Sequence, residues 1–186
     1  MAADSMTNVY DRPIIGGCRK ILRIAAGPGE VLVGFCGDVG IPGLMASGLN
    51  VDEVPAGGED PQPWADAVAC AATGLAVAAG CVEDGRLAGS LLLGWDGRLW
   101  TLVHCGAVPH ADGVAAVGSG EGPAIGALDA FLETGMAPGD AVRAAVLIGI
   151  RRDRHSAGPV QVEVLEPVGR PARLATAARK GGKRGK

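Results

Sequence analysis

The segment 20–38, KILRIAAGPGEVLVGFCGD, contains the pattern that decides the fold. Two runs rich in Ile, Leu and Val, residues 20–25 and 31–36, flank the turn GPGE at 27–30. Such runs around a turn are typical of an antiparallel hairpin, because Gly and Pro readily adopt the backbone angles of a tight turn. Asp38 follows the second run as a candidate N-cap, so we expect a helix directly after the hairpin.

Two segments further along the chain predict a second helix and a second hairpin. The stretch 63–81 spaces its apolar residues by three and four positions, which predicts an amphipathic helix. These residues are Trp64, Ala67, Val68 and Ala71. An Asp-Gly pair at 96–97 lies between two apolar runs. It predicts a second hairpin, because Asp-Gly favours the tight turn between antiparallel strands.

The C-terminal half predicts a strand, two helices and a last strand. The segment from Gly113 has the character of a strand that leads into the glycine turn GSGEG. A helix from about Pro123 to Thr134 follows, and Pro138 opens another helix with a basic C-terminal end. The alternating valines of PVQVEVLEP, residues 159–167, predict the last strand.

The predicted order of elements defines the fold class. Hairpins separated by pairs of helices favour an antiparallel α+β fold over a doubly wound parallel sheet. We therefore predict a four-layer α-β-β-α sandwich, with two antiparallel sheets between helix pairs. We assign residues 1–167 to this domain and residues 168–186 to a basic, disordered tail, since the segment 170–186 carries seven Lys and Arg and no acid.

Composition narrows the class of protein. A chain of 186 residues with 48% apolar and 20% charged residues is long enough for one soluble globular domain. No stretch has the length and apolarity of a membrane span or the layout of a signal peptide. We expect all five cysteines to be small buried residues in a reducing compartment, so we predict a cytoplasmic protein.

Several common kinds of site are not supported by the motifs. The glycines of VGSGEG do not form G-x-G-x-x-G, and no G-x-S-x-G is present, so neither a dinucleotide site nor a serine-hydrolase elbow is predicted. His104, His110 and His155 have no neighbours at ligand spacing. We therefore predict no metal and no cofactor.

Five residues remain as candidates for chemistry. Lys20 lies in an apolar run, where an unpaired ammonium is costly; the alternative is an exposed lysine on an edge strand. Asp153 and Ser156 in DRHS share one side of a helix end, or else form an ordinary capping cluster. The other two candidates are Asp4 and Ser119.

Together these pieces resemble the peptidase family of proteasome β-subunits and HslV, the N-terminal-nucleophile hydrolases. The resemblance covers roughly residues 1–166, although the central helices diverge. Its five motifs are AADS (2–5), GCRKILRI (17–24), VGFCGD (33–38), VGSGEGPAIGALDAF (117–131) and RRDRHSAG (151–158). Each motif is weak alone, but their order and the elements between them make the resemblance fairly specific.

The resemblance implies a role for each candidate. Asp4 would be the acid beside the active-site lysine, and Lys20 would lower the proton affinity of the nucleophile and its amine. Ser119 would lie near that amine, which Asp153 and Ser156 would orient. Two further residues, Thr7 and Asn8, would pair with an extended polypeptide substrate.

In this family the nucleophile is a threonine that begins the mature chain. The resemblance implies that about a dozen residues, one strand and a turn by usual lengths, precede Met1, and that the chain as printed is inactive. A start at Thr7 would supply a threonine but would delete Asp4. The implied partners are further copies of the chain in a ring and an ATP-driven unfoldase, with no membrane.

Two alternatives stay open at this point. The chain could be a non-catalytic structural subunit or a degenerate relative of the same fold. It could also be a small binding protein that uses the basic tail to reach nucleic acid or an acidic partner, although we do not expect nucleic acid as a partner.

Overall fold

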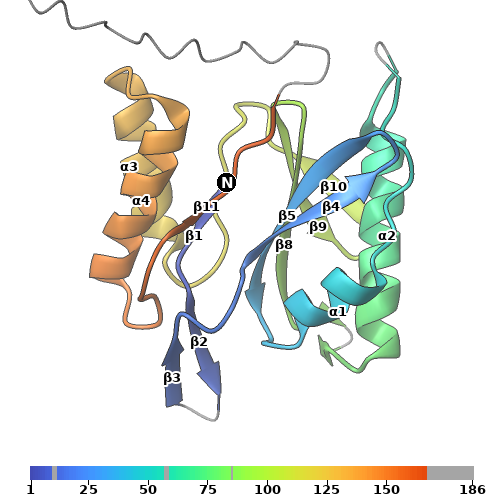
Figure 1. The fold of residues 1–186 in the computed structure, drawn as a ribbon, viewed down its shortest axis with the longest axis horizontal. Helices are drawn as coiled ribbons and strands as arrows, with labels where there is room; N and C mark the ends of the chain where they lie inside the picture. The colour runs from blue at the N-terminus through green and yellow to red at the C-terminus, as the bar shows by residue number, and fades with distance from the viewer. Residues whose placement is uncertain (10–11, 57–58, 85, 167–186) are drawn as a thin grey trace, which may run out of the picture.

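The computed structural model describes residues 1–9, 12–56, 59–84 and 86–166. The predicted basic tail, 168–186, therefore lies outside the described residues. Figure 1 shows α3 (Glu121–Glu133) and α4 (Pro138–Arg152) on one side of the molecule. On the opposite side, α1 (Ile41–Gly48) and α2 (Gln62–Ala78) cover the main sheet. Strands lie between the two helix layers, which confirms the predicted α+β fold.

The main sheet is antiparallel and contains both predicted hairpins. Its strand order is β10-β9-β8-β5-β4. The bounds are β4 (Ile21–Ala26), β5 (Gly29–Gly37), β8 (Gly89–Trp95), β9 (Arg98–Val103) and β10 (Gly106–Pro109). Asp96 and Gly97 both have positive φ, 45° and 74°, as the turn between β8 and β9 requires. The edge strand β10 has no counterpart in the sequence prediction.

Three two-stranded sheets complete the strand inventory of the described residues. The first pairs β1 (Ala2–Ala3) with β11 (Gln161–Val162), so the two ends of the domain meet. The second is a hairpin of β2 (Met6–Val9) and β3 (Arg12–Ile15), which the sequence analysis missed. The third is formed by β6 (Val82–Glu83) and β7 (Arg86–Leu87).

Two local predictions are wrong. Residues 114–117 form no strand. The residue before α1 that acts as its N-cap is Gly40, because α1 begins at Ile41. Asp38 instead closes the turn before this helix, where its Oδ1 accepts a hydrogen bond from the Gly40 amide at 2.7 Å. The carboxylate therefore caps a turn and not the helix.

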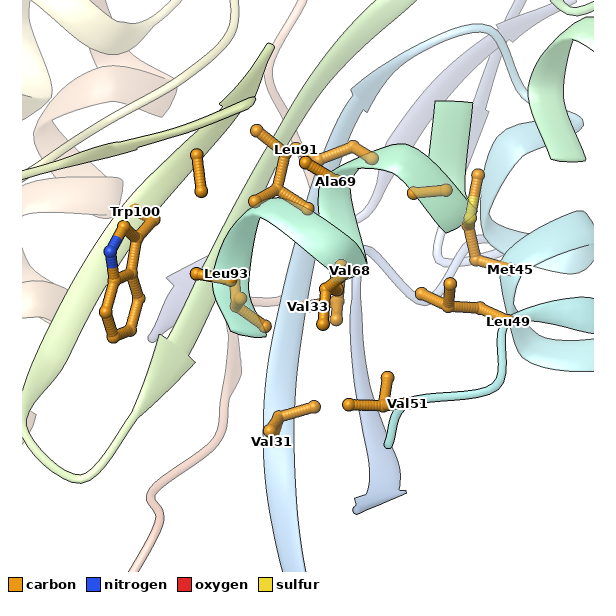
Figure 2. Close-up of a cluster of buried hydrophobic side chains, with 14 of the residues drawn as sticks. Val31, Val33, Met45, Leu49, Val51, Val68, Ala69, Leu91, Leu93 and Trp100 are labelled. Carbon is orange, nitrogen blue, oxygen red and sulfur yellow. The ribbon is translucent and has the colours of Figure 1, made fainter. Parts of the chain in front are cut away.

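The main hydrophobic core lies between the five-stranded sheet and the α1/α2 layer. Figure 2 shows Val31, Val33, Leu91 and Leu93 of the sheet in one cluster with Val51 and with Val68 and Ala69 of α2. The buried face of α2 carries four alanines beside Trp64 and Val68, and these small residues let the helix approach the sheet closely. Its alanines are Ala65, Ala69, Ala72 and Ala76.

The predicted apolar face of this helix was partly wrong. Trp64 and Val68 are buried as expected, but Ala67 and Ala71 are exposed. Alanine is compatible with both faces of a helix, so the alanines of this segment did not indicate which side meets the sheet.

The cysteines are all free thiols, and none of them is fully buried, which contradicts the prediction of five buried residues. Cys18, Cys36 and Cys81 are half-buried, whereas Cys70 on α2 and Cys105 in the turn after β9 are exposed. The Sγ of Cys70 donates to the carbonyl oxygen of Cys105 at 3.4 Å.

Among the described residues, no helix combines the length and apolarity needed to cross a bilayer.

Candidate functional site

Lys20 and Asp4 form an ion pair that joins two distant segments. Lys20 directly precedes β4, and Asp4 directly follows β1. The Lys20 Nζ lies 2.7 Å from Asp4 Oδ1, and both side chains are largely shielded from solvent, at 19% and 12% exposure. Lys20 is therefore the paired, part-buried cation of the two alternatives, and not a free lysine on the sheet edge.

Asp4 is held by the backbone as well as by Lys20. Its Oδ2 accepts hydrogen bonds from the Met6 amide at 3.0 Å and from the Ala157 amide at 3.1 Å. Three donors on one carboxylate fix its orientation. Asp4 thereby fixes the position of the Lys20 ammonium.

Asp153 is the centre of a second cluster, at the C-terminal end of α4. Its Oδ2 accepts from the Ser119 hydroxyl at 2.6 Å and from the Ser156 hydroxyl at 2.7 Å, and its Oδ1 accepts from the His155 amide at 3.2 Å. Burial by itself raises the pKa of Asp153. The hydrogen bonds from Ser119 and Ser156 outweigh burial, so the pKa of this carboxyl lies below its usual value.

Ala157 links the two clusters. Its amide donates to Asp4, and its carbonyl accepts from the Ser5 amide at 3.2 Å. Because Ala157 directly follows Ser156, this pairing holds the Asp153 cluster against the segment that carries Asp4. The structure thus brings together all five of the predicted candidates for chemistry.

The two clusters border a cleft between the α3/α4 layer and the main sheet. The cleft has a volume of about 790 Å³, and Asp4, Lys20, Ser119 and Ser156 are among its lining residues. Most of its walls are apolar. They include Leu32, Leu92 and Gly94 of the sheet and Leu128, Val146 and Ile150 of the two helices.

The structure explains why the turn before α3 contains glycines on both sides of Ser119. Gly118 has a φ of 106°, which a residue with a side chain rarely adopts. A Cβ on Gly120 would lie 3.2 Å from the Ser156 hydroxyl oxygen and 3.6 Å from Asp153 Oδ2. The glycines on either side of Ser119 therefore let the chain approach Asp153 closely enough for its hydroxyl to donate.

Thr7 and Asn8 line the same cleft from β2. The Asn8 side-chain amide lies 3.4 Å from His155 Nδ1, which ties this strand to the loop that follows α4. The structure places these two residues beside the clusters; their role toward a substrate stays a prediction.

Two participants were missed by the sequence analysis. Ala157 acts through its backbone amide and carbonyl, which no side-chain motif reveals. Gln161 of β11 bonds the backbone of Lys20 and Ile21 from 140 and more positions away. Its only sequence signal is a polar residue within an otherwise valine-rich strand, which equally describes any half-exposed strand.

The arrangement restricts the chemistry that these side chains can perform. Among the described residues, no group of three or more His, Cys, Asp and Glu side chains is placed to hold a metal ion. A lysine ammonium and a carboxylate with two serine hydroxyls are instead groups that can bind and orient an amine and bias its protonation.

Comparison with known proteins identifies the fold. No protein-family model and no curated protein matches the sequence. Among solved structures, BPH of Thiobacillus denitrificans in complex with epoxomicin matches with a TM-score of 0.68 and 19% identity, over 89% of this chain and 92% of BPH. HslV from Trypanosoma brucei matches with a TM-score of 0.59 and 22% identity, over 89% of this chain and 91% of HslV.

A third match broadens the comparison. Anbu, the ancestral beta-subunit, from Yersinia bercovieri has a TM-score of 0.58 and 16% identity, over 87% of this chain and 74% of Anbu. At such identities the likeness shows the fold alone, and this is the fold that the resemblance implied. The chain has the α+β fold of the HslV-like, proteasome-type peptidases.

Proposed function

We propose that this chain is a threonine-type peptidase subunit that hydrolyses peptide bonds in unfolded polypeptide. The observation that carries the proposal is the meeting of two polar clusters on one apolar cleft. Lys20 is paired with Asp4, Asp153 is bonded by Ser119 and Ser156, and Ala157 joins the two. Charged and hydrogen-bonded groups gathered at a cleft are the arrangement by which functional sites are recognised, and this supports the proposal.

Each group has a task in the proposed reaction. A threonine hydroxyl adds to the peptide carbonyl carbon, and the α-amine of the same threonine accepts the hydroxyl proton. That proton passes to the leaving amine as the peptide C–N bond breaks, and water then hydrolyses the threonine ester that remains. The ammonium of Lys20 favours the neutral form of that amine before attack, because two nearby positive charges repel. Asp153, oriented by Ser119 and Ser156, stabilises the amine once it is protonated.

The proposal places this threonine ahead of Met1 in the native polypeptide. Thr7 lines the cleft and is the alternative within the printed sequence. A chain that began at Thr7 would lack β1 and Asp4, so Lys20 would lose its partner carboxylate. The α-amine of Met1 itself donates to the Glu163 carbonyl at 2.7 Å, just beyond β11, and Met1 has no attacking group.

The test compares the printed chain with a chain that is extended by the residues that the native gene encodes ahead of Met1. We expect no hydrolysis of fluorogenic peptides by the printed chain and turnover by the extended one. Lys20→Ala should abolish this turnover, whereas Arg86→Ala, which removes an exposed cation on β7, should leave it unchanged. Mass spectrometry of the native protein should find threonine as its first residue.

Three results would contradict the proposal. Turnover by the printed chain that Lys20→Ala abolishes would place the nucleophile within it. An extended chain with a first threonine but no turnover would remove the peptidase assignment. Native protein without a first threonine would favour the non-catalytic subunit. Epoxomicin, which is bound to BPH in its structure, is a further probe: we expect it to bind the extended chain alone.

The proposal extends to assembly. We propose that the subunit forms a homo-oligomeric ring in the cytoplasm and receives polypeptide from an ATP-driven unfoldase. Light scattering on the extended chain tests the first part, and a mass equal to one chain at micromolar concentration would contradict it.

A further inference from the structure

Gln161 makes an unusual set of contacts for a glutamine of a two-residue strand. Its Oε1 accepts from the amides of Lys20 and Ile21, each at 3.2 Å, and its Nε2 donates to the Ile21 carbonyl at 2.8 Å. The Nε2 also donates to Glu163 Oε1 at 3.3 Å. All four hydrogen-bonding positions of the side chain are thus used, three of them on the backbone of two consecutive residues.

The hydrogen bonds of Gln161 lie at the outer edge of the main sheet. β4 is the last strand of the main sheet, so its outer N–H and C=O groups have no strand partner there. The Gln161 amide has the same donor and acceptor as a peptide group, and it supplies the missing partner for one residue. The Lys20 carbonyl is held from the other side, where it accepts from the Phe35 amide at 2.9 Å.

This arrangement fixes both ends of the Lys20 side chain. The backbone at its base is bonded to Gln161 and Phe35, and its ammonium is bonded to Asp4. Gln161 also pairs across the small sheet with Ala3, the residue before Asp4. One residue therefore connects the segment that holds the carboxylate to the strand that holds the lysine.

We propose that Gln161 is a positioning residue that sets the Lys20–Asp4 pair at the cleft; the inference rests on the proposed function, in which Lys20 acts on the nucleophile. Gln161 acts through the Lys20 backbone and through β1, and is not itself among the residues that line the cleft. Its loss releases the base of Lys20 and lets the ammonium leave the carboxylate for solvent.

The closing experiment measures how well Lys20 is shielded in the printed chain. Limiting acylation with an amine-reactive ester, quantified by peptide mass spectrometry, reports on each lysine. The sequence has three other lysines, Lys180, Lys183 and Lys186, which serve as references within the same molecule. Asp4→Asn, which removes the ion pair, marks the fully released level.

We expect Gln161→Ala to raise the relative labelling of Lys20 about fivefold, the factor that corresponds to one lost hydrogen bond. Gln161→Glu keeps an acceptor for the two amides but loses the Nε2 donor to the Ile21 carbonyl and to Glu163 Oε1, and it places two carboxylates together, so its labelling should also exceed that of the wild type. The matched control is Gln62→Ala. Gln62 bonds the Ala107 carbonyl and Trp100 in another layer, and its loss should leave Lys20 labelling unchanged.

Wild-type labelling in Gln161→Ala, or an equal increase in Gln62→Ala, would overturn the inference. If Gln161→Ala does not fold, Gln161→Glu decides in the same way. The measurement needs no peptide hydrolysis, so it separates this inference from the proposed function. In an active extended chain, Gln161→Ala should lower kcat with little change in KM, and an unchanged kcat would also overturn the inference.

Discussion

At the scale of single residues, the two carboxylates of the site are held by different kinds of donor. Asp4 is bonded by one ammonium and two backbone amides, whereas Asp153 is bonded by two hydroxyls and one amide. Backbone donors remain when a side chain is replaced, but a side-chain donor does not. The two positions therefore respond differently to substitution and to pH.

Asp4→Asn should destabilise the chain more than Lys20→Met. Removal of the carboxylate strands the Lys20 ammonium and weakens the bonds to Met6 and Ala157. Removal of the lysine leaves Asp4 with both backbone donors. We expect a loss of about 2 to 3 kcal/mol in unfolding free energy for Asp4→Asn and about 1 kcal/mol for Lys20→Met. Urea unfolding measures both, and a larger loss for Lys20→Met would contradict the role of the backbone donors.

The lowered pKa of Asp153 predicts the direction of a pH effect. Because the folded-state pKa lies below the unfolded one, the ionised carboxylate contributes stability above the unfolded pKa of about 3.9. That contribution is lost as the pH falls through the folded pKa. The difference in unfolding free energy between wild type and Asp153→Asn should shrink when the pH falls from about 5 to about 2. A difference that does not change with pH would contradict the assignment.

The site residues named from the sequence are ones whose side chains carry an interaction, and their catalytic roles stay predictions. Lys20, Asp153 and Ser156 were named from their side-chain chemistry and given roles by the family resemblance, and the structure brings them together with Asp4 and Ser119. Ala157 was missed because its contribution is a backbone amide. Gln161 was missed because its partners lie far away in the sequence.

At the scale of elements, the turn before α3 determines where Ser119 lies. Gly118 turns the chain with a φ of 106°, and Glu121–Glu133 then continues as helix. A Cβ on Gly118 would also lie 3.3 Å from Cys36 Cβ on β5. The turn, and not the helix, therefore carries the strict requirement for glycine.

Gly118→Ala and Gly122→Ala should act in opposite directions. Alanine at 118 must adopt a left-handed backbone conformation against Cys36, so we expect a loss of about 1 to 2 kcal/mol. Gly122 lies in α3, and a Cβ added there would have nothing within 4 Å, so alanine should stabilise the helix by up to about 1 kcal/mol. Chemical denaturation measures both, and equal effects would contradict this account of the turn.

Elements whose signals are local were predicted, and those that depend on a partner were not. Both main-sheet hairpins follow from turn residues at 27–30 and 96–97. The strand expected after Gly113 does not form, and β10 takes the edge of the sheet beside β9 instead. Four-residue strands such as β2 and β10 are too short to show a clear alternation of apolar and polar residues. Whether such segments form strands depends on the strands with which they pair.

At the scale of the whole molecule, the two faces of the main sheet have different surroundings. One face is covered by α1 and α2 over a continuous core (Figure 2). The other borders the cleft of about 790 Å³ beneath α3 and α4. Protein interiors are close-packed, so a cleft of this size between layers is space that a ligand or chain segment can fill.

Two adjacent leucines of β8 report on these two faces. Leu93 is fully buried in the core toward α2, and Leu92 lines the cleft. Leu93→Ala should cost about 3 to 5 kcal/mol, because it leaves a new cavity in a packed layer. Leu92→Ala should cost less, about 2 kcal/mol, because Leu92, although only 8% exposed, lies outside the main core and borders the cleft.

The same pair also tests whether the cleft is filled when the chain is active. Urea unfolding of both variants in the printed and the extended chain gives four free-energy losses. If a segment ahead of Met1 packs against Leu92, the cost of Leu92→Ala should rise in the extended chain while that of Leu93→Ala stays constant. A cost of Leu92→Ala that is the same in both chains would mean that the upstream segment does not pack on this face of the sheet. The threonine of the proposed function would then have to reach Lys20 by another route.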